Sequence, residues 1–333
     1  AALASAGAWR RTDARADAWT AGFGRRHRPV ATEVPRLTGA VGIVTGASSG
    51  LGAEVAWRLA EAGADRVVLG CRDLARCEGA REAWLQQCLH GPAGRAACLA
   101  TSSRCECRAL DLADASSVRV FARQQVAELR GGQDVILVNN AGVMGAPSPQ
   151  GPQEAAGVGG AWADGHLWPN HCGHFLLTRS LLPAMGRGSC VIVVASRAHH
   201  QGALRFDADG LLDLDHGGGH WYRRYARSKL CNVLFAAEWR RRFPDGPSCA
   251  AVSPGRVSTG IFAGVPPPLG PALGALARLC FQSPAEGACH VLAPLAALRG
   301  AAASAAGSPA EALPLYWHLG QPQEPSAAAS DPA

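Results

Sequence analysis

The stretch AVGIVTGASSGLG, residues 40–52, places a short apolar run directly before a glycine-rich turn. The run at 40–44 has the length and composition of a buried strand. Apolar residues then recur at helical spacing, at Val55, Ala56 and Leu59. A strand, a glycine turn and a helix N-terminus in succession form a phosphate site, because free N–H groups and the helix dipole face the same anion. The stretch therefore predicts a nucleotide-binding α/β fold.

Further apolar runs follow this stretch and alternate with segments of helical periodicity. We predict strands at 66–70, 107–110, 134–138, 189–195, 249–252 and 313–317. We predict helices at 73–89, from about 116, from 170 to about 185, around 225–237 and at 284–298. Alternating strands and helices build a parallel sheet with helices on both faces. The expected fold is α/β: a single doubly wound Rossmann-type domain with a mostly parallel seven-stranded sheet.

The composition along the chain predicts the limits of this domain. We expect it to span residues 38–318, with a Pro-rich substrate lid at about 256–283. Residues 1–37 are rich in Ala and Arg without hydrophobic periodicity, and we expect a disordered or targeting leader. Residues 319–333 have the composition of a disordered tail. Two insertions into surface loops are predicted, at 91–104 and 145–165.

Charge and cysteine content exclude several classes of function. The net charge of +6 comes from arginines spread along the chain, so we predict no nucleic-acid partner. No apolar run reaches about 18 residues, so no transmembrane span is predicted. The twelve cysteines show no metal-binding spacing, and His171 and His174 lack a third ligand, so we predict no metal site. We expect mostly buried thiols in a reducing, intracellular compartment, with cytoplasm and chloroplast both open.

Tyr225-Ala226-Arg227-Ser228-Lys229 contains the only lysine of the chain, four residues after a tyrosine. On a helix, positions i and i+4 share a face, so the phenol and the ammonium would project together. A neighbouring ammonium favours the phenolate and lowers a tyrosine pKa that is normally about 10. We therefore predict that Tyr225 is a general acid/base. The alternative is a solvated lysine beside a tyrosine that packs against the core.

Polar residues at the ends of the predicted strands indicate where ligands bind, because α/β sheets present binding groups at the carboxyl ends of their strands. Arg72, after the second strand, favours the 2′-phosphate of NADP(H); pairing with Asp73 is the alternative. Asp111 is placed to accept from an adenine amino group or to cap the next helix. Asn139-Asn140-Ala141-Gly142 and Ser196 follow two further strands.

The order of these motifs resembles the short-chain dehydrogenase/reductase superfamily over about residues 38–318. The resemblance implies an oxidoreductase in which Tyr225 moves a proton at the substrate oxygen and Ser196 hydrogen-bonds that oxygen. It implies that Lys229 tunes Tyr225 and holds the nicotinamide ribose, and that Asn170 supports a water-linked proton relay. The cofactor-binding residues implied are Thr45, Gly46, Ser48, Ser49, Gly50, Leu51, Gly52, Arg72, Asp111, Leu112, Asn140, Ala141, Gly142, Tyr225, Lys229, Pro254, Gly255, Val257 and Thr259.

Two branches of the superfamily are most similar. The stretch 170–178 resembles retinol dehydrogenases, and the stretches 228–232, 259–262 and 315–317 resemble light-dependent protochlorophyllide oxidoreductases. The leading hypothesis is NADP(H)-dependent transfer of hydride to or from a carbonyl or alcohol of a lipophilic substrate. The alternatives are a light-dependent protochlorophyllide reductase and a non-enzymatic NADPH-sensing partner. The resemblance leaves a homodimer and a peripheral membrane contact open.

Overall fold

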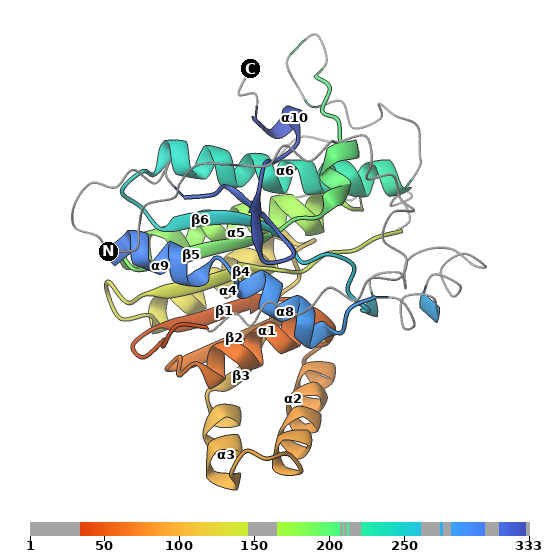
Figure 1. The fold of residues 1–333 in the computed structure, drawn as a ribbon. Coiled ribbons are helices and arrows are strands. Elements are labelled where there is room, and N and C mark those ends of the chain that lie inside the picture. Colours follow the sequence, from red (N-terminus) through yellow and green to blue (C-terminus); the bar gives the residue numbers. More distant parts are fainter. Residues whose placement is uncertain are drawn as a thin grey trace, which may run out of the picture.

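An eight-stranded sheet forms the centre of the computed structural model, which describes residues 34–145, 165–206, 209, 212, 221–260, 274–275, 281–303 and 313–330 (Figure 1). The strand order is β3-β2-β1-β4-β5-β6-β7-β8. All neighbouring pairs are parallel except β7 with β8. The strands are β1 Val41–Thr45, β2 Arg66–Cys71, β3 Cys105–Ala109, β4 Val135–Asn139, β5 Cys190–Val194, β6 Ser248–Ser253, β7 Tyr316–His318 and β8 Gln321–Gln323.

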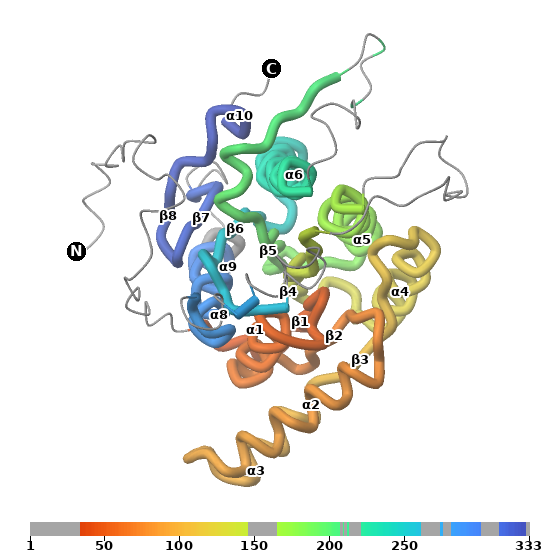
Figure 2. Tube along the Cα trace, turned by 90° about the vertical axis from the view of Figure 1, so that its right-hand side faces the viewer, coloured from red at the N-terminus to blue at the C-terminus, as the bar shows by residue number. Residues whose placement is uncertain are grey.

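Helices cover both faces of this sheet (Figure 2). The longer helices are α1 Gly50–Glu61, α2 Leu74–Leu89, α3 Arg95–Ser103, α4 Ala115–Glu128, α5 Gly173–Leu181, α6 Trp221–Arg242, α8 Pro284–Leu292 and α9 Leu295–Ala303. Short helical turns are η1 Trp168–Cys172, η2 Leu182–Ala184, η3 Arg197–Gln201 and α10 Ala327–Ser330. One core cluster joins the sheet to α1, α8 and α9, and the other joins it to α4, α5 and α6. The predicted doubly wound α/β fold is confirmed.

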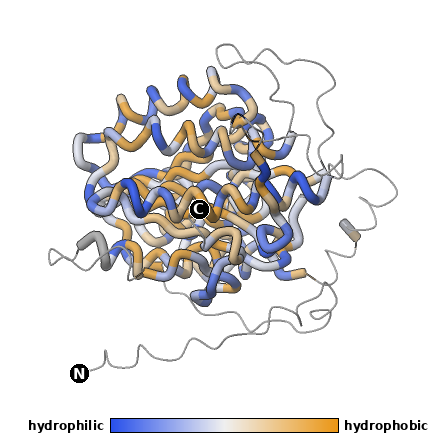
Figure 3. Tube along the Cα trace, turned by 90° about the horizontal axis from the view of Figure 1, so that it is seen from above, coloured by the Kyte–Doolittle hydropathy of each residue, from blue (hydrophilic) through white to orange (hydrophobic). Residues whose placement is uncertain are grey.

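The side chains of β1 show how the two cores arise from one strand. Val44 belongs to the cluster under α1, whereas Val41 and Ile43 belong to the cluster under α4, α5 and α6. Successive side chains of a strand point to opposite faces, so a strand with both faces covered must be apolar throughout. All five residues of β1 are buried, and Figure 3 shows hydrophobic colouring along the strands at the centre of the molecule.

The chain reverses its direction across the sheet between β1 and β4. From β1 it moves outward to β2 and β3, and it then returns to β4 on the other side of β1. The helices that follow β1 and β4 lie on opposite faces, which leaves a crevice beyond the carboxyl ends of these two strands. The glycine-rich turn at 46–50 and the stretch 140–142 therefore meet at the position where doubly wound sheets bind ligands.

Both predicted ends of the domain need correction. Leu37, predicted to lie in the leader, is fully buried and its N–H donates to the Ala62 carbonyl at 2.9 Å. The tail predicted to be disordered from residue 319 contains β8 and α10. β8 makes an eighth, antiparallel strand because Leu319 and Gly320 adopt positive φ and turn the chain back onto β7. Residues 1–33 lie outside the described part of the chain.

Residues 91–104, predicted to be a loop insertion, mostly form α3. Helices α2 and α3 make a hairpin that extends away from the body of the protein (Figures 1 and 2). The cysteines were predicted to be mostly buried thiols; seven of the described cysteines are free, and disulfides join Cys77 to Cys107 and Cys88 to Cys98. Sequence spacing gave no sign of these pairs, since their partners are brought together by the hairpin and by the packing of α2 on β3. The insertion predicted at 145–165 lies almost wholly outside the described residues.

The helix predicted at 284–298 is two helices, α8 and α9. Pro294 lies between them, and it has no N–H to donate to the preceding turn. Ser283 begins α8 with a reciprocal capping box in which its hydroxyl and Glu286 satisfy each other's backbone N–H groups. The two ends of the predicted lid at 256–283 lie side by side. The Ser258 N–H donates to the Gln282 carbonyl, and Val257 and Gln282 form a β-bridge. Its interior, at 261–273 and 276–280, lies outside the described residues.

Candidate active site

The glycine turn between β1 and α1 has the geometry of a phosphate site. Gly46 and Gly50 have φ of 66° and 56°, a conformation that glycine adopts without strain. A Cβ on Gly52 would lie 2.5 Å from the Asn140 amide nitrogen and from the Gly46 carbonyl, so only glycine fits there. Ser49 caps α1 without a side-chain hydrogen bond to the helix. The first N–H groups of α1 therefore have no side-chain cap of their own, which fits a bound anion.

Thr45 ties this turn to the end of β4. It is fully buried, and its hydroxyl accepts from the backbone N–H of Asn140 at 2.9 Å and of Ala141 at 3.0 Å. The Nε2 atom of His174 lies 2.8 Å from the same oxygen. Asn140 completes the link, because its side-chain amide donates to the Thr45 carbonyl at 2.8 Å. Thr45 was predicted to bind cofactor. Its side chain is fully buried and instead holds the loop after β4 against the glycine turn.

Asn170 holds the loop after β4 against α6. Its side-chain oxygen accepts from Val143 N at 2.8 Å, and its amide donates to Val143 O at 3.1 Å and to the Ser228 hydroxyl at 3.0 Å. Asn170 and Ser228 are both fully buried. The Ser228 hydroxyl in turn donates to the Tyr225 carbonyl at 2.7 Å. Asn170 is therefore a structural tie beside Tyr225, and its role in a proton relay stays a prediction.

Tyr225 and Ser196 come together from different elements. Ser196 follows β5 and begins the turn η3, whereas Tyr225 lies in the second turn of α6. Burial raises the pKa of Tyr225 to about 12, and a hydrogen bond with the Ser196 side chain opposes part of that rise. The net direction is opposite to the lowered tyrosine pKa that the sequence predicted, because burial of the phenolate dominates; the effect of Lys229 on this pKa stays a prediction. At neutral pH the phenol is therefore protonated, and its role as an acid/base stays a prediction.

Lys229 lies one helical turn after Tyr225 and is almost completely buried. Its Nζ atom donates to the Val194 carbonyl at the end of β5, at 2.9 Å, and lies 5.6 Å from the centre of the Tyr225 ring. Desolvation lowers the pKa of Lys229 to about 8. A Cβ on Gly142 would lie 3.4 Å from Nζ and 3.5 Å from the Asn170 side-chain oxygen. Gly142 thus lies directly in front of the lysine. Lys229 is only 2% exposed, so the alternative of a solvated surface lysine is excluded.

The residues predicted for the adenosine end lie around the first turn of α2. Arg72 is exposed directly after β2, and Asp73 caps α2 by accepting from the Arg76 N–H at 2.9 Å. The guanidinium of Arg76 donates to the Ser49 hydroxyl at 3.0 Å. Two arginines therefore flank the glycine turn, where the sequence indicated one. The alternative pairing of Arg72 with Asp73 is not among the hydrogen bonds and ion pairs of the described residues.

Asp111 and Leu112 follow β3 on the same edge of the sheet. One carboxylate oxygen of Asp111 accepts from Ala113 N at 2.9 Å, and Asp114 rather than Asp111 caps α4. Leu112 is buried, and its carbonyl oxygen packs closely on Gly173: a Cβ added to Gly173 would lie 2.3 Å from that oxygen. Asp111 thus shapes the loop with one oxygen, and its contact with an adenine stays a prediction.

The segment after β6 returns to the glycine turn. The Pro254 carbonyl lies 3.1 Å from His290 Nδ1, and Gly255 has φ of 86°. Val257 is buried against Gly287 of α8, where Leu51 of α1 also packs. The Thr259 side chain lies beside Gly50, at 3.2 Å from the position of an added Cβ. The predicted cofactor residues of this segment and of the glycine turn are therefore neighbours; their contact with a cofactor stays a prediction.

Several residues that organise the site were not found from the sequence. His174 is fully buried, and burial lowers its pKa to about 3, so a neutral ring links Asn170 O to Thr45. His171 Nδ1 lies 3.1 Å from the Asn232 side-chain oxygen. His199 Nδ1 lies 2.7 Å from the Ser196 carbonyl, and its Nε2 accepts from Ser326 N at 3.1 Å. No metal site was predicted at His171 and His174, and these rings instead reach Asn232 and Thr45, which are distant in sequence.

Two features are absent from the described residues: a helix able to span a membrane and a cluster of metal-binding side chains. Across the described part of the chain, none of the helices combines the length and hydropathy needed to cross a bilayer. Within the same residues, no three His, Cys, Asp or Glu side chains gather in an arrangement that could hold a metal ion. His216 and His220 lie outside the described residues.

Known proteins similar to this chain agree with the geometry. The model of the short chain dehydrogenase family matches residues 40–208. Retinol dehydrogenase 12 from Bos taurus is 38% identical over 231 residues, which cover 67% of this chain and 63% of that protein. Dehydrogenase/reductase SDR family member 13 from Bos taurus is 37% identical over 259 residues, covering 76% of this chain and 61% of that protein. The chain thus spans less than two thirds of the length of either relative.

Solved structures show the same fold at lower identity. A short-chain type dehydrogenase/reductase from Mycobacterium marinum has a TM-score of 0.55 at 21% identity, covering 80% of this chain and 91% of that one. An alcohol dehydrogenase from Thermococcus sibiricus, complexed with 5-hydroxy-NADP, has a TM-score of 0.54 at 19% identity, covering 86% of this chain and 99% of that one. The retinol dehydrogenase relatives favour the first of the two branches considered above. These mammalian relatives lend no support to a chloroplast.

Proposed function

Because this chain belongs to the short-chain dehydrogenase family, we propose that it is an NADP(H)-dependent oxidoreductase that interconverts an alcohol and a carbonyl group. One observation carries the proposal. Tyr225 and Ser196 share a hydrogen bond at the carboxyl end of β5, and the buried Lys229 lies one helical turn away. Two hydroxyls and one ammonium around an open glycine position suit a carbonyl oxygen that gains a proton as its carbon gains a hydride.

The side chains divide this work between them. Ser196 and Tyr225 would both hydrogen-bond the substrate oxygen, and the protonated Tyr225 would donate the proton during reduction. Lys229 would stabilise the negative charge left on the phenolate, at 5.6 Å from the ring centre. When bound, the nicotinamide would supply the hydride for reduction or accept it during oxidation. In the oxidative direction the same groups act in reverse, with Tyr225 taking the proton from the alcohol.

The choice of NADP(H) rests on the adenosine end. Arg72 is exposed after β2, and Arg76 reaches the Ser49 hydroxyl at 3.0 Å. The carboxylate of Asp73, the first acidic residue after β2, is engaged as the cap of α2. Two guanidinium groups and a helix N-terminus favour a 2′-phosphate over a bare ribose hydroxyl. NADP(H) is therefore the proposed cofactor.

We propose a lipophilic substrate with a terminal alcohol or aldehyde, of the kind named in the retinol dehydrogenase relatives. The segment 256–283 would cover that substrate, and its two ends are held together by the pairing of Ser258 with Gln282. A homodimer and a peripheral membrane contact remain predictions for the whole protein.

Substitution of Tyr225 by Phe tests the proposal. We expect turnover of retinal and other lipophilic aldehydes with NADPH to fall by at least about 100-fold, because general acid catalysis contributes about 10²–10⁴-fold. The affinity for NADPH should stay within about twofold, since the substitution removes a neutral hydroxyl and no charge. Tyr222→Phe, in the preceding turn of the same helix, is the matched control. Undiminished turnover in Tyr225→Phe would remove the proposed role of the tyrosine.

A further inference from the structure

Helix α2 follows directly on the residues that we assign to the 2′-phosphate, and few of its side chains enter the core. Of its sixteen residues, Cys77 alone is buried. Trp84 is partly buried and stacks on Trp57 with the ring centres 4.8 Å apart. Arg81 pairs with Glu78 of the same helix, which fixes neither end to the sheet. The position of the first turn of α2 therefore depends mainly on Cys77.

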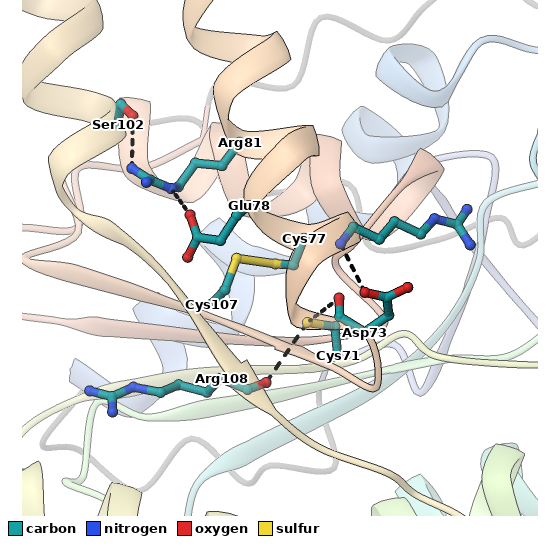
Figure 4. Close-up of a disulfide and its surroundings, with 9 residues drawn as sticks. Cys71, Asp73, Cys77, Glu78, Arg81, Ser102, Cys107 and Arg108 are labelled. Carbon is teal, nitrogen blue, oxygen red and sulfur yellow. Dashed lines mark hydrogen bonds and ion pairs between the residues drawn. A yellow bond between two sulfur atoms is a disulfide. The ribbon is translucent and has the colours of Figure 1, made fainter.

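Cys77 is covalently joined to Cys107 in the middle of β3 (Figure 4). The two Cα atoms lie 6.1 Å apart, a separation that a disulfide spans without movement of the backbone. Cys107 is a firm anchor, because it pairs in register with Leu69 of β2, which is fully buried. The disulfide thus fastens the first turn of an otherwise exposed helix to the central sheet.

Arg76 immediately precedes Cys77, so the disulfide also determines where Arg76 lies. Its backbone N–H donates to Asp73, and its guanidinium donates to the Ser49 hydroxyl. Ser49 is the residue that caps α1, at the point where a nucleotide phosphate would meet the free N–H groups. A guanidinium held beside this helix end adds a charged donor for a second phosphate group.

We propose that the Cys77–Cys107 disulfide holds Arg76 as a specificity-determining residue, so that cleavage of the bond weakens the preference for NADP(H) over NAD(H). The inference rests on the proposed use of NADP(H). A dithiol would cleave the bond by thiol–disulfide exchange: the protein gains two electrons and two protons as two thiols, and the reagent becomes a disulfide. With its tether broken, α2 keeps the Asp73 cap, the packing of Cys77 and the stacking of Trp84 on Trp57, but it loses its covalent link to the sheet.

The two other thiols nearby do not replace the bond. Burial raises the pKa of Cys71 to about 11 and that of Cys105 to about 12. Such thiols contain little thiolate at neutral pH, so they neither attack the disulfide nor pair readily with a released Cys107. Reduction should therefore produce one defined state, with Cys77 and Cys107 as thiols.

Dissociation constants for NADPH and NADH test this inference, measured by fluorescence on the full chain before and after treatment with dithiothreitol. For the oxidised protein we expect a clear preference for NADPH. Reduction, or the double substitution C77S/C107S, should weaken NADPH binding about tenfold, the loss of one charge-assisted contact, while NADH changes by less than about twofold. The pair C88S/C98S removes the disulfide between α2 and α3 and should leave both constants unchanged.

Arg76→Gln keeps both disulfides, so it distinguishes an effect of the arginine from an effect of the Cys77–Cys107 bond. Oxidised Arg76→Gln should bind NADPH as weakly as reduced wild-type protein and should no longer respond to dithiothreitol. An unchanged NADPH-to-NADH ratio in reduced wild-type protein would overturn the inference, as would a full response to dithiothreitol in Arg76→Gln. Both readouts remain valid if C77S/C107S fails to fold. Oxidised wild-type protein that prefers NADH would instead overturn the proposed use of NADP(H), and this inference with it.

Discussion

At the nicotinamide end of the candidate site the functional side chains lie in the core, whereas at the adenosine end they lie on the surface. Asn170, Tyr225 and Lys229 are all at most 4% exposed. Asn170 is held by Val143 and Ser228, and Lys229 is held by the Val194 carbonyl. Arg72 and Arg76 are exposed, and Arg76 is held by one cap, one hydroxyl and a neighbouring disulfide.

This difference corresponds to two kinds of chemistry. Proton transfer needs groups with displaced pKa values in fixed positions, and burial provides both at a cost in folding free energy. Phosphate binding needs positive charge and N–H donors, which operate at a surface and cost little. Substitutions at the two ends should therefore differ in kind: those at the buried end alter turnover and stability together, and those at the exposed end alter only affinity.

The largest effect is expected for Lys229→Met. Turnover should fall by about 100- to 1,000-fold, because the charge that stabilises the developing phenolate is removed. The same substitution should raise the free energy of unfolding at pH 7 by about 2 kcal/mol, since burial costs the ammonium about 3 kcal/mol and the lost hydrogen bond returns about 1 kcal/mol. Arg242→Met, at the exposed end of the same helix, is the control. Unchanged turnover would contradict the proposed catalytic role.

The pH dependence of stability sharpens this prediction. The folded pKa of Lys229, about 8, lies below its unfolded value of 10.5. Between these values the unfolded chain holds a proton that the folded chain has lost, so wild-type stability rises with pH across this window. Lys229→Met lacks this rise. Its advantage in urea unfolding should therefore shrink from pH 7 to pH 10, and an advantage that stays constant would show that lysine burial is not its origin.

Gly46→Ala tests the turn that the two ends share. Gly46 has positive φ, and an added Cβ would lie 2.9 Å from the Cα and Cβ atoms of Ala141. Strain and overlap together should lower the free energy of unfolding by about 2–3 kcal/mol and weaken NADPH binding as well. Gly79→Ala is the control, because that glycine is in an exposed part of α2 with open space around it. Equal stability of the two variants would show that the turn tolerates a side chain.

His199→Gln should have a smaller effect, confined to the buried end. The ring connects the Ser196 carbonyl to Ser326 of the C-terminal segment. Loss of two hydrogen bonds that position Ser196 should reduce kcat about tenfold, with the NADPH dissociation constant unchanged. His90→Gln, at the end of α2, should leave kcat unaltered. A loss of NADPH affinity in place of kcat would show that the C-terminal segment supports the other end of the site.

The smallest effect is expected for Arg72→Gln. Removal of one exposed guanidinium should weaken NADPH binding about fivefold and leave NADH binding and the melting temperature unchanged. Arg81→Gln, further along α2 and paired with Glu78, should change neither affinity. If Arg72→Gln weakens NADH as strongly as NADPH, then Arg72 contacts a part of the nucleotide other than the 2′-phosphate.

Elements with strong local patterns were predicted closely from the sequence. The strand predicted at 66–70 is β2 at 66–71, and the helix predicted at 73–89 is α2 at 74–89. Errors occurred where the pattern was weak: the polar stretch 91–104 contains α3, and the tail after 319 pairs with β7. Short polar strands such as β8 depend on a partner strand rather than on their own apolar periodicity.

The sequence predicted which residues form the candidate site, but not the direction of their pKa shifts. Tyr225, Lys229 and Ser196 do lie together, as the order of motifs implied. The direction of the Tyr225 pKa was wrong, because spacing reveals the neighbouring ammonium but not the burial that outweighs it. Arg76, His174 and His199 were not found from the sequence, since their contacts with Ser49, Thr45 and Ser326 span 27, 129 and 127 residues.

By itself, the sequence determined the strand, glycine turn and helix at 40–61 and the order of the motifs that follow, because apolar periodicity and glycine positions are local properties. Only the tertiary structure decided which cysteines pair, which arginine reaches the glycine turn, and that burial raises the pKa of Tyr225. Pairing and burial are set by contacts between residues distant in the chain, and those contacts exist only once the sheet and its two helical layers have packed.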